Sequence, residues 1–121
     1  MGRLIAGLLA VGLLLQTGLA LAHHGWSWTT GGNIELTGVI QSARLGNPHG
    51  VLQVNVDGEV WTVEVGQPWR NERAGLRDGD LSEGVEIRAV GEPSGDESEK
   101  RLKAERLFLG GQEYDLYPGR D

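Results

Sequence analysis

The stretch VLQVNVDGEVWTVEV, residues 51–65, decides the fold, because it carries the clearest pattern in the chain. On both sides of Asp57-Gly58, apolar residues alternate with polar ones, and the apolar positions are Leu52, Val54, Val56, Trp61, Val63 and Val65. The Asp-Gly dipeptide accepts the positive backbone angles of a tight turn between two strands. The stretch therefore predicts a β-hairpin.

The segments around this hairpin predict further strands and one short helix. Alternation begins at Ile34 and recurs in residues 84–93, 101–109 and 112–117, and Pro68–Leu76 is typical of a short helix that begins at a proline. In residues 101–109 the apolar phase changes between Ala104 and Leu107, which indicates a β-bulge. The order of elements favours an all-β fold with one short helix, a small five- to six-stranded OB-like β-barrel. An open antiparallel sheet or a six-stranded sandwich is the alternative.

The N-terminal 22 residues are typical of a secretory signal peptide. Arg3 precedes an apolar run from Leu4 to Leu15, and Ala20-Leu21-Ala22 provides a small-residue cleavage site. The run is shorter than the ~20 apolar residues that a membrane span needs. We expect residues 1–22 to be the signal peptide, 23–33 an N-terminal arm and 34–121 one barrel domain, in a periplasmic or secreted protein that has left the membrane. An uncleaved anchor is the alternative.

The composition excludes several classes of function. Loss of Arg3 with the signal leaves ten basic residues against 17 acidic ones, a formal net charge of −7. Nucleic acid is therefore not an expected partner, because phosphate contacts need clustered Lys and Arg. The serines have no nucleophile-elbow context, and no catalytic residues are predicted. The carboxylates are interpreted as a solvated surface, among them Glu64, Glu72, Asp78 and Asp80.

Three histidines are the candidate metal ligands: His23, His24 and His49. Cleavage after Ala22 would give His23 a free α-amine beside its imidazole, a chelating pair, and His49 lies in an Asn47-Pro48-His49 turn. The chain lacks cysteine, and Met1 leaves with the signal, so nitrogen and oxygen donors favour copper(II), with zinc or nickel as further possibilities. No particular protein partner is indicated. Solvated terminal histidines and a turn-stabilising His49 are the alternatives.

Cleavage after Ala20 would change the predicted chelate. His23 would then be the third residue, where amine, two amides and imidazole can surround copper(II) or nickel(II) in a plane. Either cleavage site leaves the metal prediction in place.

The four tryptophans suggest a second reading of the function. Trp61 and Trp69 fit core positions, whereas Trp26 and Trp28 are expected to pin the arm onto the barrel near His49. Alternatively, Trp26 and Trp28 form a stacking platform, which would make the protein a small-molecule or glycan binding module. A redox enzyme with a copper centre is a third class.

Several motifs together resemble a family of small exported bacterial proteins of unknown function. The most specific are Ala22-His23-His24 and Asn47-Pro48-His49, and the similarity extends over the whole mature chain. The resemblance implies a periplasmic, β-rich domain with histidines in its recurring motifs. The chain departs from the pattern at Gly25-Trp26, where serine and phenylalanine are expected. The terminal histidine alone resembles the histidine brace of copper monooxygenases and related copper carriers.

Overall fold

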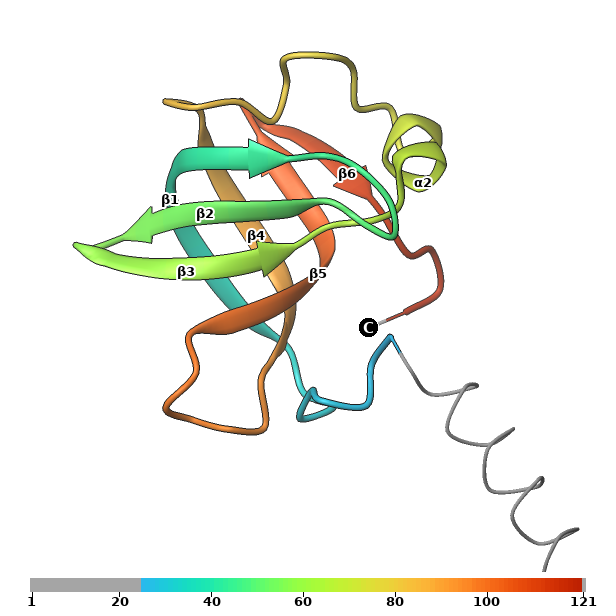
Figure 1. Ribbon diagram of the computed structural model, residues 1–121. Helices are drawn as coiled ribbons and strands as arrows, with labels where there is room; N and C mark the ends of the chain where they lie inside the picture. The colour runs from blue at the N-terminus through green and yellow to red at the C-terminus, as the bar shows by residue number, and fades with distance from the viewer. Residues whose placement is uncertain (1–24, 121) are drawn as a thin grey trace, which may run out of the picture.

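The computed structural model describes residues 25–120 of the chain (Figure 1). The predictions for the signal peptide, for its cleavage site and for His23 and His24 fall on residues 1–24 and lie outside the described residues.

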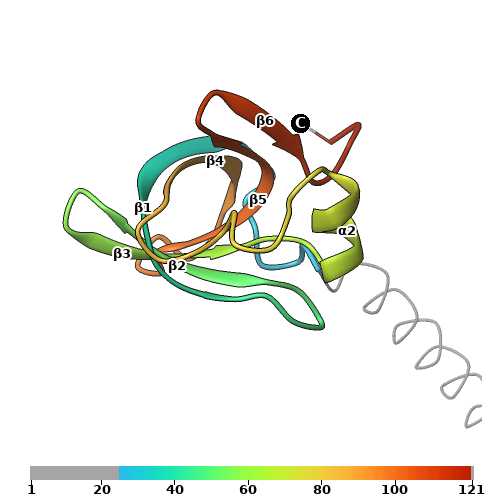
Figure 2. The same ribbon diagram turned by 90° about the horizontal axis from the view of Figure 1, so that it is seen from above.

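Six strands and one short helix form an OB-like barrel, as the sequence predicts. The elements in chain order are β1 Ile34–Arg44, β2 Val51–Val56, β3 Glu59–Glu64, α2 Pro68–Arg73, β4 Glu86–Pro93, β5 Arg101–Leu109 and β6 Gln112–Asp115. The strands are hydrogen-bonded in the order β3-β2-β1-β4-β5-β6, and a parallel pairing of β3 with β5 closes the first five into a barrel. Figure 2 shows these strands curving around a common interior. The open sheet and the sandwich are thereby excluded.

The predicted hairpin is confirmed. Asp57 and Gly58 both have positive φ angles, 52° and 88°, as a two-residue turn between twisted strands requires. The paired residues include Leu52 with Val63 and Val54 with Trp61, so the alternating apolar side chains of both strands share the inner face.

Glycine allows the tightest backbone contact in the barrel. A Cβ atom on Gly91 of β4 would lie 2.0 Å from the carbonyl oxygen of Lys103 on β5. Only glycine can approach a neighbouring strand this closely. The contact lies beside an irregularity in the pairing, where Val90 pairs with Arg106 but Gly91 pairs with Ala104.

That irregularity is the predicted bulge, and Glu105 is its extra residue. The bulge keeps Leu102, Ala104 and Leu107 on the inner face of β5, each of them with 0% of its surface exposed. Lys103 and Glu105 consequently lie on the outer face of the same strand.

The apolar core fills the barrel interior and extends under α2. It comprises Ile40, Leu52, Val54, Val63, Val65, Leu76, Leu81, Ile87, Ala89, Leu102, Ala104, Leu107 and Leu116. Trp61 packs against its margin. The prediction that Trp69 belongs to the core is wrong, because this side chain is 53% exposed and contacts the guanidinium groups of Arg70 and Arg73 instead.

Within residues 25–120, no helix has the length and apolar character needed to cross a bilayer.

Candidate functional site

His49 lies just before β2, on the outer face of the barrel. Gly50 continues the hairpin ladder beyond Val51, since its N–H donates to Gly66 and its carbonyl accepts from Val65, both at 2.9 Å. Val51 pairs with Glu64, and residues two apart on a strand face the same way. His49 and Glu64 therefore face each other, and the Nε2 atom of His49 lies 2.7 Å from Oε1 of Glu64.

Glu64 is buried, with 3% of its surface exposed, and it links His49 to β5. Its second oxygen, Oε2, accepts a hydrogen bond from Nε of Arg101 and forms an ion pair with Nη2 of the same guanidinium. The interpretation of Glu64 as part of a solvated acidic surface is therefore wrong. Glu64 is buried because β3 pairs with β5 where the barrel closes. The register of this pairing sets Thr62 of β3 opposite Arg101 and Glu64 opposite Lys103.

Lys103 stands between two buried carboxylates on the outer face. Its register partners are Glu64 on β3 and Glu92 on β4, and the three residues are only 3 to 4% exposed. Burial lowers the pKa of Lys103 below its usual value, the guanidinium of Arg101 lowers it further, and Glu64 opposes the shift. A charged row thus crosses three strands on the face opposite the core.

The N-terminal arm covers this row with two tryptophans. The ring of Trp26 lies 5.5 Å from the Lys103 ammonium and meets Tyr117 edge-on at 5.2 Å, and the Arg101 guanidinium lies 3.7 Å above Trp28. The expected packing of Trp26 and Trp28 on the barrel is observed. The segment forms a turn, however, in which the N–H of Thr29 donates to the carbonyl of Trp26.

Arg120 joins the arm to the C-terminal tail, and Figure 1 shows the two segments meeting beside the barrel. Its guanidinium lies 3.5 Å from the Trp26 ring, and its Nη2 is 2.9 Å from Oε2 of Glu92. The hydroxyl of Thr29 donates to the other oxygen of Glu92 at 2.8 Å. Nε of Arg120 also lies 3.3 Å from Oε1 of Glu105, although the two atoms are not aligned for a hydrogen bond.

Sequence reasoning missed Lys103, Glu92 and Glu105 as buried groups. In the sequence, each is a charged residue at an outward position of an alternating strand, and that pattern is also typical of a solvated face. The one available signal is the presence of Trp26 and Trp28 in the arm, since two large rings need a surface to cover.

The His49 side chain can act as a ligand near neutral pH. Burial lowers the pKa of His49 below its usual value, Lys103 adds to the shift, and Glu64 opposes it. The lowered pKa favours the neutral imidazole, which is the form that coordinates a metal. Its side chain is 29% exposed, so part of the ring is accessible. Within residues 25–120, no three His, Cys, Asp or Glu side chains gather as a metal-binding group.

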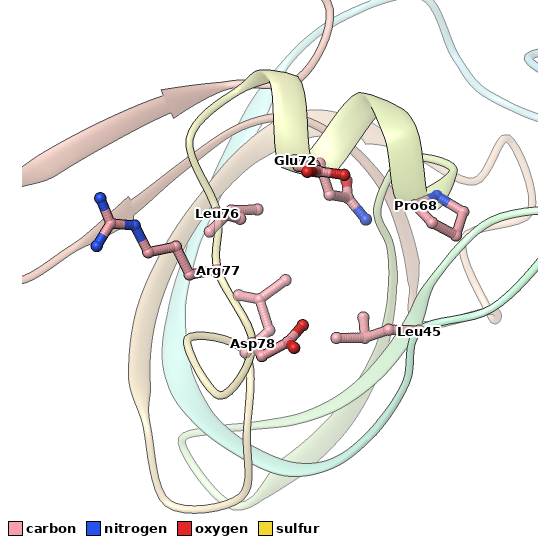
Figure 3. Close-up of a pocket in the computed structure, with 8 residues that line it drawn as sticks. Leu45, Pro68, Glu72, Leu76, Arg77 and Asp78 are labelled. Atoms are coloured by element: carbon pink, nitrogen blue, oxygen red, sulfur yellow. The ribbon is translucent and has the colours of Figure 1, made fainter.

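A pocket of about 520 Å³ lies apart from His49, where α2 meets the end of the barrel (Figure 3). Leu45 and Asp78 face each other across this pocket, while the guanidinium of Arg77 points away from it. Leu76, Leu81 and Pro68 also line the pocket, together with the polar Asn71 and Glu72, and His49 does not line it.

The comparisons with known proteins identify the family. Residues 11–103 match a family model described as a family of unknown function (DUF6152). The chain belongs to this family. The match includes all three histidines, and the description of DUF6152 names no activity. A search of curated proteins found no match.

Solved structures show the same fold at low sequence identity. The Stn1–Ten1 complex of S. pombe contains a chain that is 22% identical with a TM-score of 0.51, and the match covers 64% of this chain and 57% of that one. A ZRD-deleted mutant of TiaS in complex with agmatine is 12% identical with a TM-score of 0.50, covering 69% and 26%. The DUF6152 chain thus spans little more than half of the first chain and about a quarter of the second. These similarities support the barrel fold alone.

Proposed function

We propose that this DUF6152 protein is a periplasmic or secreted metal-binding module that binds copper(II) through His23, His24 and His49. The observation that carries the proposal is that the arm and the His49–Glu64 pair meet on one charged surface of the barrel. Trp26 lies over Lys103, and Lys103 stands opposite Glu64, the partner of His49.

The length of the arm limits how far the terminal histidines can be from this surface. His23 is three residues before Trp26, and three residues span at most about 11 Å. A docked Trp26 therefore supports a site in which His23 and His24 approach His49. The two predicted halves of the metal site would then be joined by the arm.

The donor chemistry favours copper(II). A mature N-terminus at His23 would offer an α-amine and an imidazole on one residue, and His24 or His49 would add a third nitrogen. Tetragonal nitrogen ligation suits copper(II), which also binds such donors more tightly than nickel(II) or zinc does. Export and cleavage after Ala22 are part of the proposal, because they create the amine.

The glycan alternative is not favoured by the arrangement of the tryptophans. Trp26 is in contact with Arg120 and Tyr117, and Trp28 with Arg101. These contacts account for both rings as packing groups that hold the arm on the barrel.

The test is a copper(II) titration of protein exported with its native signal, after intact mass has established the N-terminus. We expect one equivalent to bind against a competing chelator, with nitrogen hyperfine structure in the electron paramagnetic resonance spectrum and quenched tryptophan emission. His49→Ala and His23→Ala should each weaken binding, whereas Glu72→Gln, at an exposed position of α2, should not.

A second preparation isolates the contribution of the α-amine. Protein made without export, in which a methionine and the native residues 17–22 precede His23, keeps every imidazole but moves the α-amine seven residues away from His23. Its affinity should be lower and its spectrum altered. Unchanged affinity in both His23→Ala and His49→Ala, or the absence of tight binding in the exported protein, would contradict the proposal.

A further inference from the structure

We infer that Glu64 is the positioning residue of the candidate metal site: it holds the His49 imidazole in the tautomer protonated at Nε2 and so leaves Nδ1 as the nitrogen for a metal. The metal step of this inference rests on the proposed function. The tautomer is a property of the metal-free protein and can be tested without any metal.

The contacts of Glu64 determine which nitrogen carries the proton. Oε2 of Glu64 accepts a hydrogen bond from Nε of Arg101 and forms an ion pair with Nη2, as expected of an ionised carboxylate. An ionised carboxylate has no proton to donate. The 2.7 Å contact between Oε1 and Nε2 of His49 must therefore be a hydrogen bond donated by Nε2–H.

A neutral imidazole has one N–H group, so the lone pair of His49 then belongs to Nδ1. Histidines that bind metals commonly donate their other N–H to a carboxylate, which fixes the tautomer and the orientation of the ring. The His49–Glu64 pair already has this arrangement in the metal-free chain. The orientation of the His49 imidazole is consequently set before any metal arrives.

The barrel backbone holds both members of the pair. Gly50 and Val51 are tied to β3 by the hairpin ladder, and a Cβ on Gly50 would lie 2.6 Å from Cγ2 of Val65, so His49 is followed by a residue that must stay small. Where β5 pairs with β3 to close the barrel, Arg101 of β5 donates to Glu64 of β3. The orientation of the imidazole is thus set by β2, β3 and β5.

The experiment is a long-range ¹H–¹⁵N correlation spectrum of metal-free protein labelled with ¹⁵N-histidine, at neutral pH, with His49 assigned by its loss in His49→Ala. We expect the pattern of an Nε2–H imidazole in the wild type. Glu64→Gln should shift the ring toward a mixture of tautomers, because a glutamine can also turn its amide N–H toward Nε2.

Glu92→Gln is the matched control for the tautomer. Glu92 is as buried as Glu64 and also faces Lys103, but it accepts hydrogen bonds from Thr29 of the arm and Arg120 of the tail and none from His49. This variant should leave the His49 pattern unchanged. A conserved thermal unfolding midpoint in Glu64→Gln would show that the variant is folded, and Glu64→Asp, with a shorter side chain, provides a second folded variant.

The outcomes separate this inference from the proposed function. A wild-type His49 protonated at Nδ1 or at both nitrogens, or a pattern that Glu64→Gln leaves unchanged, would overturn the role of Glu64 even if copper(II) binds. If His49 has the expected tautomer but the protein does not bind copper(II), the role of Glu64 holds and the proposed metal-binding function is wrong. If both hold, Glu64→Gln should lower copper(II) affinity by about 10- to 100-fold.

Discussion

In the middle of β5, the two faces of the strand are both buried and chemically opposite. On the inner face, Leu102 and Leu107 pack in the barrel core with no exposed surface. On the outer face, Lys103 is 4% exposed and Glu105 is 0% exposed, beneath the arm and the tail. Burial alone therefore does not distinguish the two faces. They differ in the chemistry of the residues that cover them.

The inner face of β5 contributes to the stability of the barrel through hydrophobic burial, whereas the outer face contributes to the orientation of the segments that cover it. Apolar burial stabilises the barrel in proportion to the area removed from water. Burying a charge has a desolvation cost that its partners only partly offset, so buried ion pairs are weak evidence for stability. We infer that the buried charged residues of the outer face orient the arm, the tail and His49.

The largest expected effect is on the inner face. Leu102→Ala should lower the free energy of unfolding by about 2–5 kcal/mol, because it removes buried methyl groups and leaves a cavity. Urea denaturation measures the change. Val60→Ala is the control, because Val60 is 47% exposed and should lose far less. A loss below 1 kcal/mol in Leu102→Ala would mean that the inner face is not the principal source of stability.

On the outer face, Glu105→Ala should cost about 1–3 kcal/mol, because it removes a charged acceptor together with the hydrogen bond and the ion pair made to it. The amide of Asn33 donates to Glu105 at 2.9 Å, and Arg120 lies beside its other oxygen. Urea denaturation is again the measurement, with Glu113→Ala at an exposed position of β6 as the control. A stabilised Glu105→Ala protein would show that desolvation outweighs these contacts.

Acid should release the arm before it unfolds the barrel. Burial by itself would raise the pKa of Glu92, but hydrogen bonds from Thr29 and Arg120 outweigh it and lower the pKa below the usual value of about 4.3. Because the folded pKa is the lower one, the stabilising contribution of Glu92 is present above that usual value and is lost as pH falls through the folded pKa.

Tryptophan emission should follow this release, since Trp26 stacks on Arg120, the partner of Glu92. Glu92→Gln removes the titrating group and should lack the acid step in emission. An identical acid transition in both proteins would show that Glu92 does not control the docking of the arm.

The smallest effect is expected outside both faces. Trp69→Ala should change the free energy of unfolding by no more than about 0.5 kcal/mol, because Trp69 is more than half exposed on α2. Thermal unfolding measures it, and Trp61→Ala, at the margin of the core, provides the contrast. A larger loss in Trp69→Ala would mean that α2 docks through this ring.

The candidate site shows how far sequence reasoning reaches. His49 could be singled out because histidine is rare in this chain and Asn47-Pro48 marks a turn. The burial of its partner Glu64 could not be foreseen, because β5 and Arg101 cover Glu64 only when β3 pairs with β5. His23 and His24 remain predictions.

The sequence by itself determined the barrel: the hairpin at Asp57-Gly58, the inward residues of each strand and the bulge near Glu105 follow from alternation and turn preferences, which are local properties of the chain. The tertiary structure decided what covers the outward residues. An outward Lys103 or Glu64 has the same sequence pattern whether it meets water or another segment. Only the closure of β3 on β5 and the docking of the arm and tail buried these charges. The contact of Glu64 with His49 comes from the pairing of β2 with β3.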